Sequence, residues 1–212
     1  MLELDDVRYA LGDASLRLSL GIGDDVPHVL LGRSGAGKST LLNLIAGSIA
    51  PTSGDIRWRG RSLLGLPFHA RPVDTLVQDH ALFPHLDVAR NVALGLPPEL
   101  GPYDVDHDEV REALDTADLA GLAGRRPNTL SDAERRRAAL ARQLLGRAPV
   151  LLMDEPFGAL AGADREALRE LAREVLARRR PCTIVVTHDA DDAAALGARV
   201  LRLVDGELRV EG

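Results

Sequence analysis

The stretch "VPHVLLGRSGAGKSTLLNLIAG", residues 26–47, decides the fold of this chain. An apolar run precedes a glycine-rich loop and an apolar-periodic segment follows it, which predicts a buried strand, a loop and a helix in that order. Residues 32–39 match the whole pattern G-x-x-x-x-G-K-[ST]. Because its glycines let backbone N–H groups turn inward around phosphate oxygens, the pattern predicts a phosphate-binding loop rather than a chance turn.

This loop also predicts the ligand that it binds. Lys38 is expected to reach the β- and γ-phosphates of a nucleoside triphosphate, and the Ser39 hydroxyl is expected to ligate Mg²⁺. The residues expected to contact the nucleotide are Gly32, Arg33, Ser34, Gly35, Ala36, Gly37, Lys38, Ser39 and Thr40.

Polar side chains follow three other apolar runs. Asp154 and Glu155 follow "VLLM", His188 follows "CTIVVT", and Gln78 follows "VDTLV". The carboxyl ends of parallel strands form one edge of a sheet, so we expect these residues to gather there. Asp154 would hold Mg²⁺ through water, and Glu155 would orient or deprotonate an attacking water. His188 would contact the γ-phosphate, and Gln78 would bind Mg²⁺ or the water; each is informative only as part of the set.

The rest of the pattern predicts an α/β fold. Strands alternate with helices, which favours a P-loop NTPase core with a mostly parallel sheet. Residues 2–11 and 15–22 read as strands around a turn, which adds an N-terminal antiparallel piece. Residues 200–212 read as a hairpin with Asp205 and Gly206 at its turn. We expect residues 1–212 to form one domain, with an inserted helical subdomain over about 80–146.

Composition limits the partners and the location. Of 212 residues, 45% are hydrophobic and the net charge is −6, which gives no overall attraction for nucleic acid. The basic runs at 135–137 and 178–180 are interpreted as solvated helix faces, and the single cysteine, Cys182, as a buried thiol. We see neither a signal-peptide core nor an apolar stretch of the ~20 residues that a membrane helix needs. The sequence therefore predicts a cytoplasmic protein that meets a membrane through a partner.

The order of these motifs, with "LS" and "RRRAALAR" before "LLMDEP", resembles the ATP-binding cassette (ABC) ATPases over nearly the whole chain. The resemblance implies that the loop binds ATP, that Asp154 serves Mg²⁺ and that Glu155 is the catalytic base. It implies that His188 is a γ-phosphate switch and that Gln78 begins a loop contacting the membrane subunit. It also makes Tyr9 the candidate for stacking on adenine.

A narrower likeness rests on "GRSGAGKSTLLNLIAG", "ALFPHLDVARNVALGL" and "MDEPFGAL". These resemble the ATPase subunits of bacterial thiamine importers, although importers of ions and other small solutes share much of the pattern. The likeness implies ABC permease subunits as partners and a peripheral place on the inner face of the cell membrane. The permease would dock near the apolar Leu82, Phe83, Leu86 and Val88; the alternative is that these side chains pack the subdomain's own core. The solute itself is bound by other subunits.

Two segments depart from the family pattern. The signature Leu-Ser-Gly-Gly-Gln, which closes over the ATP of the other subunit, is here "LSDAE", residues 130–134. Ser131, the nucleotide contact retained from it, can form a capping box with Glu134, and Asp132 adds negative charge at the helix start. After "MDEP", Ala161 replaces an Asp that reaches across the dimer.

These departures leave alternatives open. Residues that serve the chain's own ATP are intact, whereas those that serve a partner's ATP are altered. A homodimer would therefore hydrolyse ATP slowly, whereas pairing with a second ABC ATPase would supply a normal signature. The candidate functions are a transport ATPase, a nucleotide-binding switch with weak hydrolysis, and a P-loop kinase, in which the "LS" segment would have no use.

Overall fold

The computed structural model describes residues 1–11, 14–76, 82–97 and 104–210. The chain divides into two compact units. The core unit consists of Met1–Thr75, Pro149–Glu155 and Pro181–Gly212, and the helical unit of Leu76–Ala148 and Pro156–Arg180. The helical unit thus takes in the helix after "MDEP" as well as the segment that the sequence analysis expected to be inserted.

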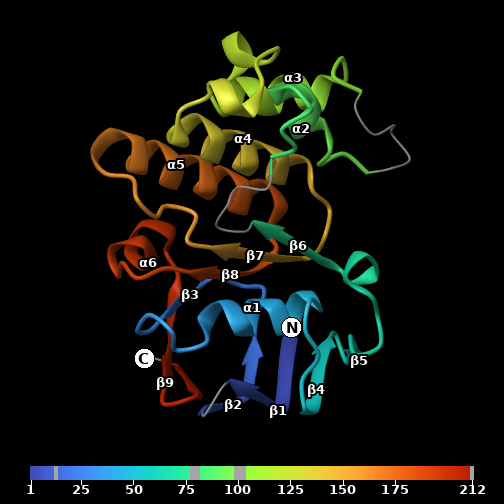
Figure 1. The fold of residues 1–212 in the computed structure, drawn as a ribbon, viewed down its shortest axis with the longest axis vertical. Coiled ribbons are helices and arrows are strands. Elements are labelled where there is room, and N and C mark those ends of the chain that lie inside the picture. Colours follow the sequence, from blue (N-terminus) through green and yellow to red (C-terminus); the bar gives the residue numbers. More distant parts are fainter. Residues whose placement is uncertain (12–13, 77–81, 98–103, 211–212) are drawn as a thin grey trace. The chain divides into compact units, whose positions relative to one another are not determined.

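One mixed sheet of ten strands organises the core unit (Figure 1), in the order β5-β4-β1-β2-β10-β9-β3-β8-β7-β6. The strands are β1 (Leu2–Leu11), β2 (Ala14–Ile22), β3 (His28–Leu31), β4 (Ser53–Trp58), β5 (Arg61–Ser62), β6 (Val73–Leu76), β7 (Val150–Asp154), β8 (Cys182–Val186), β9 (Arg199–Val204) and β10 (Glu207–Val210). The core-unit helices are α1 (Lys38–Ala46), α6 (Asp191–Leu196) and the short 3-10 turn η1 (Phe68–Ala70).

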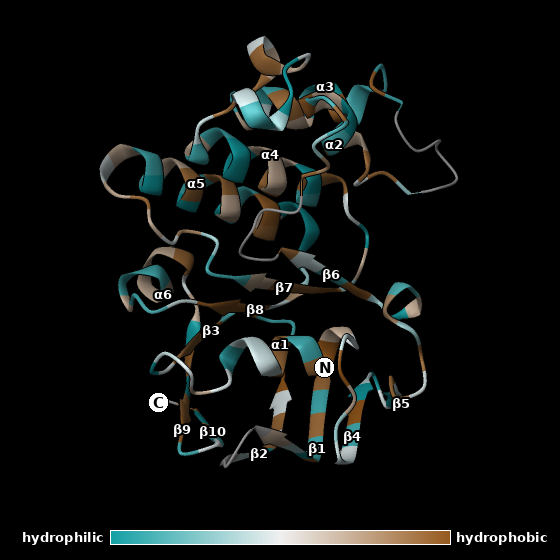
Figure 2. Cartoon of the chain, viewed as in Figure 1, coloured by the Kyte–Doolittle hydropathy of each residue, from teal (hydrophilic) through white to brown (hydrophobic). Residues whose placement is uncertain are grey.

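The antiparallel half of the sheet comes from the predicted N-terminal strands. β1 pairs antiparallel with both β2 and β4. Leu2, Leu4 and Val7 of β1 are buried, with a shift of register between Leu4 and Val7. Figure 2 shows the strand banded brown and teal. This is the pattern of a strand with one face on the core. β9 and β10 form the predicted hairpin around Asp205 and Gly206.

In the parallel half, β3 pairs with β8 and β9, and β8 pairs with β7. β3 and β8 are buried at every residue, as their unbroken apolar runs predict. α1 packs against β7. Arg71, which is only 8% exposed, donates two hydrogen bonds of 2.8 Å to the carbonyls of Leu44 and Ile45, so a cation closes the C-terminal end of α1.

Among the titratable side chains buried in this unit are Cys182 and His28. Cys182 is fully buried, as expected, and desolvation raises the pKa of its thiol to about 11. His28 is 4% exposed, and burial, assisted by the nearby Arg199 charge, lowers the pKa of its imidazole. Both groups are therefore uncharged at neutral pH, in keeping with an apolar environment.

The helical unit contains α2 (Val88–Ala93), α3 (Asp108–Thr116), η3 (Ala120–Leu122), η4 (Pro127–Thr129), α4 (Asp132–Leu145) and α5 (Gly162–Arg179). α4 packs against α2, α3 and α5. Figure 1 shows α4 and α5 running side by side. The buried side chains of α5 include Leu168, Leu171 and Val175, which lie on one face of the helix.

Our interpretation of both arginine runs as solvated faces is correct for Arg178 and Arg180, which are exposed, and wrong for Arg136 and Arg179. Arg136 is 8% exposed and donates to the carbonyl of Pro156 at 3.1 Å. Arg179 donates to the carbonyls of Gln143 and Ala148 at 2.9 and 2.8 Å. These guanidinium groups bond to carbonyls that lie outside their own helices, and a pattern of charges along one helix does not reveal such acceptors.

Candidate nucleotide-binding site

The glycine-rich loop lies between β3 and α1, as predicted. Gly35 and Gly37 have φ angles of 77° and 97°, in the left-handed region that disfavours side chains. A Cβ atom at Gly35 would meet nothing within 4 Å. The glycine is therefore required by the backbone conformation and not by lack of space.

The start of α1 suits an anion. Its first residues, Lys38, Ser39 and Thr40, carry no negative charge, and the helix N-terminus presents backbone N–H groups. The ammonium Nζ of Lys38 donates to the carbonyls of Gly32 and Arg33 at 2.8 and 3.0 Å. The lysine thus lies over the loop, and these residues fit the phosphates of a nucleotide.

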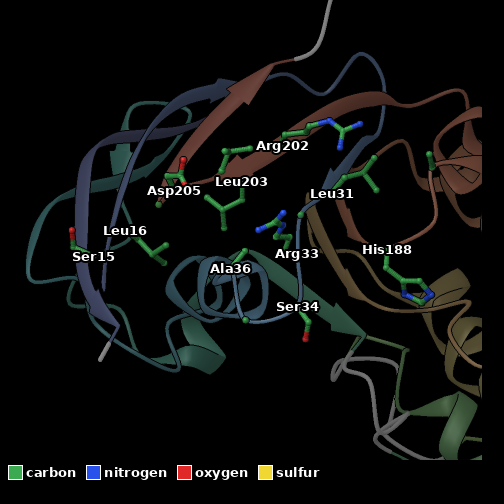
Figure 3. A pocket seen from close by; sticks show the side chains of 15 residues that line it. Ser15, Leu16, Leu31, Arg33, Ser34, Ala36, His188, Arg202, Leu203 and Asp205 are labelled. Carbon is green, nitrogen blue, oxygen red and sulfur yellow. The ribbon is translucent and has the colours of Figure 1, made fainter. Parts of the chain in front are cut away.

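A cleft with a volume of about 1180 Å³ adjoins the loop (Figure 3). Residues 31–36 form one wall, and further residues come from β2, from β9 with its turn, and from the segment after β8. They include Ser15, Leu16, His188, Ala190, Arg202 and Asp205. Every lining residue belongs to the core unit, so one unit carries both the phosphate loop and the space beside it.

Tyr9 is placed near this cleft by strand pairing. It lies directly opposite Leu16 in the antiparallel β1–β2 pair. Paired residues project to the same face of a sheet, and Leu16 lines the cleft. Tyr9 itself is half-buried against the hydrophobic core.

The acidic pair follows a buried strand, as the sequence indicated. Asp154 ends β7 and is half-buried. Glu155 has a φ of 49°, a left-handed conformation that costs a residue with a side chain on the order of 1–2 kcal/mol. Its N–H donates to the carbonyl of Val186 at 2.9 Å, and its Oε2 atom lies 3.0 Å from Nδ1 of His188. The two strand ends therefore bring Glu155 and His188 into contact.

Two of the predicted residues remain, Gln78 and Ser131. Gln78 lies outside the described residues. Ser131 is in the helical unit, where it caps α4: its Oγ accepts the Glu134 N–H at 3.2 Å, and its own N–H donates to Glu134 Oε2 at 2.6 Å. The pKa of the Glu134 carboxyl is lowered, and the hydrogen bond that the Ser131 N–H donates to it is the largest cause. Asp132 forms an ion pair with Arg135, so its charge is partly compensated.

Several residues around the cleft were not predicted from the sequence. Arg202 lies opposite Leu31 in the parallel β3–β9 pair, and this position depends on strand order, which the sequence does not state. α6 was missed as well, because six residues are too few to show a helical period. The one local signal was Asp191 and Asp192 at its start, where acidic residues favour a helix N-terminus.

Among the described residues, no set of three or more His, Cys, Asp or Glu side chains is grouped to hold a metal. A magnesium ion bound through the Ser39 hydroxyl and Asp154 would take its other oxygen ligands from phosphate and water, as this ion commonly does. In the same ranges, no helix is long and apolar enough to cross a bilayer.

The fold and the phosphate loop define an ATPase of the ABC class. Residues 16–158 match the ABC transporter family, and the chain belongs to it. The chain is 41% identical to the thiamine import ATP-binding protein ThiQ of Cereibacter sphaeroides, over 97% of this chain and 89% of that protein. It is 37% identical to the protein of that name from Escherichia coli, over 100% and 91% of the two chains.

Solved structures give the same result for the fold. The ATP-binding cassette MJ0796, in a dimeric post-hydrolysis state bound to ADP and Pi, aligns with a TM-score of 0.82 and 28% identity. The alignment covers 100% of this chain and 98% of MJ0796. The predicted fold class is therefore confirmed, and the chain is an ABC-type ATPase similar to thiamine import ATP-binding proteins.

Proposed function

We propose that this chain is the ATP-hydrolysing subunit of a membrane importer for a small solute, with thiamine as the first candidate. One observation carries the catalytic part of this proposal: His188 lines the cleft beside the phosphate loop and lies 3.0 Å from the Glu155 carboxylate. An acid, an imidazole and a lysine-bearing loop are the groups that hydrolysis of a terminal phosphate uses. The thiamine assignment rests on the names of the relatives.

Each group has a proposed task. Lys38 and the N–H groups of the loop bind the phosphates, and Tyr9 stacks on the adenine. Glu155 holds the attacking water and accepts its proton, while His188 orients Glu155 and contacts the γ-phosphate. Ser39, Asp154 and Gln78 would hold Mg²⁺, which would neutralise charge that develops on the phosphate oxygens.

The proposed partners are ABC permease subunits and a second ATPase subunit, and the chain would sit on the inner face of the cell membrane.

Phe83 is 47% exposed, whereas Val88 is fully buried. The apolar cluster at 82–88 therefore divides: Val88 packs inside the helical unit, and Phe83 is free to meet a permease. Phe83→Asp should abolish capture by the cognate ABC permease, while Phe68→Asp, at a residue 49% exposed, should not. Equal capture by both variants would contradict this docking site.

A second candidate, a switch with little hydrolysis, is favoured by the start of α4. The Ser131–Glu134 box and the Asp132–Arg135 ion pair occupy groups that an anion would otherwise meet. Ala161, which precedes α5, carries only a methyl group where the family has a carboxylate. We therefore propose a slow homodimer, with faster turnover when a second ABC ATPase supplies an intact signature.

The test is ATP binding and hydrolysis by the purified chain with Mg²⁺. Calorimetry should show ATP uptake that Lys38→Ala abolishes and that Arg61→Ala, which removes an exposed cation from β5, leaves unchanged. Phosphate release then separates the two candidates, because turnover at an ordinary rate would exclude the switch. Failure of well-folded protein to bind Mg-ATP would overturn both.

A further inference from the structure

Three hydrogen bonds hold the residue before His188. Thr187 is 1% exposed, and its N–H donates to the carbonyl of Leu30 at 3.3 Å. Its hydroxyl donates to Oδ2 of Asp192 at 2.6 Å, and the hydroxyl oxygen accepts the N–H of Asp189 at 3.2 Å. Because Leu30 lies in β3, which leads into the phosphate loop, these bonds tie the end of β8 to that strand.

The partner of the Thr187 hydroxyl is a buried acid. Asp192 lies on α6 and is 0% exposed. A buried carboxylate is costly unless hydrogen bonds satisfy it, and a bond from a hydroxyl to a carboxylate is short and strong. The hydrogen bond between Thr187 and Asp192 therefore holds the chain inside the core unit, one residue before the exposed side chain of His188.

His188 has little support of its own. Its side chain is 66% exposed, so packing does not hold the ring, and its bond to Glu155 joins it to a residue with left-handed backbone. The position of the ring therefore depends on the backbone that carries it. That backbone is held on one side by the bonds of Thr187.

We propose that Thr187 and Asp192 form a positioning pair that holds His188 in reach of Glu155 and of the cleft. This inference rests on the proposed function, because it assigns the pair a task in hydrolysis. The pair itself is buried and touches no substrate. Its loss should slow turnover and leave ATP binding nearly unchanged, since Lys38 and the loop bind the phosphates.

The test compares Thr187→Val, which removes the hydroxyl at nearly constant volume, with Thr187→Ser, which keeps it. In the full chain with Mg-ATP we expect Thr187→Val to lower kcat at least tenfold and to change KM less than threefold. Thr187→Ser should stay within threefold of the parent kcat. Asp192→Ala reaches the pair from its other member and should reproduce the loss if Thr187→Val folds poorly.

A matched control separates positioning from general destabilisation. Thr183 is a buried threonine near the start of β8, the strand that leads to Thr187, and its hydroxyl donates to the carbonyl of Pro181 at 3.0 Å. Thr183→Val should lower the melting temperature and leave kcat unchanged when assayed well below melting.

The decisive measurement repeats Thr187→Val in a His188→Ala background. If Thr187 acts only by positioning His188, its hydroxyl has no role once the imidazole is absent. Adding Thr187→Val to the His188→Ala variant should therefore change kcat less than twofold. A normal kcat in folded Thr187→Val or Asp192→Ala, or a full additional loss in the His188→Ala background, would overturn the inference. If the parent protein does not hydrolyse ATP, the proposed function fails instead.

Discussion

Glu155 and His188 lie at the ends of two neighbouring parallel strands, and their side chains meet at 3.0 Å. The contact joins a half-buried carboxylate, 18% exposed, to an imidazole that is 66% exposed. It places the expected base against the residue expected to contact the γ-phosphate.

Glu155→Gln should lower phosphate release by roughly 10²–10⁴-fold, the usual contribution of a positioned general base. The amide keeps the size of the side chain but cannot accept a proton. ATP affinity measured by calorimetry should change little. Glu166→Gln, at an exposed residue of α5, is the control. Undiminished hydrolysis by the Glu155→Gln variant would show that Glu155 is not the general base.

Nucleotide should protect Lys38 from chemical modification. It is the only lysine in the sequence, so amine-reactive reagents can modify just this side chain and the N-terminus. Bound phosphates would compete for its ammonium group, which now bonds to the carbonyls of Gly32 and Arg33. Mass spectrometry after acetylation should show that Mg-ATP slows labelling several-fold and that adenosine does not. Equal rates with and without ATP would count against the assigned contact.

Restoring the family signature should speed up the homodimer. We expect the triple change Asp132→Gly, Ala133→Gly and Glu134→Gln to raise hydrolysis at least about tenfold, because removing one preorganised donor to a phosphate-like oxygen typically costs more than that. Two glycines in the first turn of α4 should also destabilise it by up to about 2 kcal/mol. Ala167→Gly with Ala177→Gly, at exposed sites of α5, controls for that loss of stability. An unchanged rate would show that the signature does not limit turnover.

Ala161→Asp should stabilise the chain by about 1 kcal/mol. Ala161 precedes α5 with extended backbone angles, and a carboxylate there can accept a helix N–H. Urea unfolding measures the gain, and Ala161→Val is the control because valine tolerates these angles but has no acceptor. If the aspartate and valine variants unfold at the same urea concentration, the capping argument is wrong.

Stability should fall between neutral and mildly acidic pH because of His28. Burial lowers the pKa of its imidazole, so the folded state binds a proton less readily than the unfolded chain. The stabilising contribution of the neutral ring is complete above the unfolded pKa of about 6.5 and is lost as pH falls toward the folded value. Urea unfolding at pH 8.0 and 5.5 should show a smaller difference for His28→Leu than for the parent. His69→Leu, at an exposed site, should keep the parent's difference.

Local patterns predicted much of the fold. The phosphate loop, the Asp205–Gly206 hairpin and the Ser131–Glu134 box each depend on neighbours in sequence, and all three are present. Long-range features were less accessible. The place of Arg202 depends on strand order, and the burial of Arg136 depends on a carbonyl twenty residues away.

In the candidate site too, some features could be predicted from the sequence and others depend on tertiary contacts. Strand ends predicted that Glu155 and His188 would be neighbours, because parallel strands share an edge. The left-handed backbone of Glu155 and the bond between Thr187 and Asp192 were not predicted, since neither follows from residue type alone. Both arise where the chain leaves the sheet, and there tertiary contacts override local preference.

The buried Cys182 makes this chain convenient for spectroscopy. A thiol with its pKa raised to about 11 and no exposure is almost inert toward maleimides at neutral pH. A single reporter cysteine can therefore be introduced at any surface position without first removing the native one. With two such cysteines, a pair of fluorophores or spin labels would report distance changes during the nucleotide cycle, and the rest of the sequence would stay unaltered.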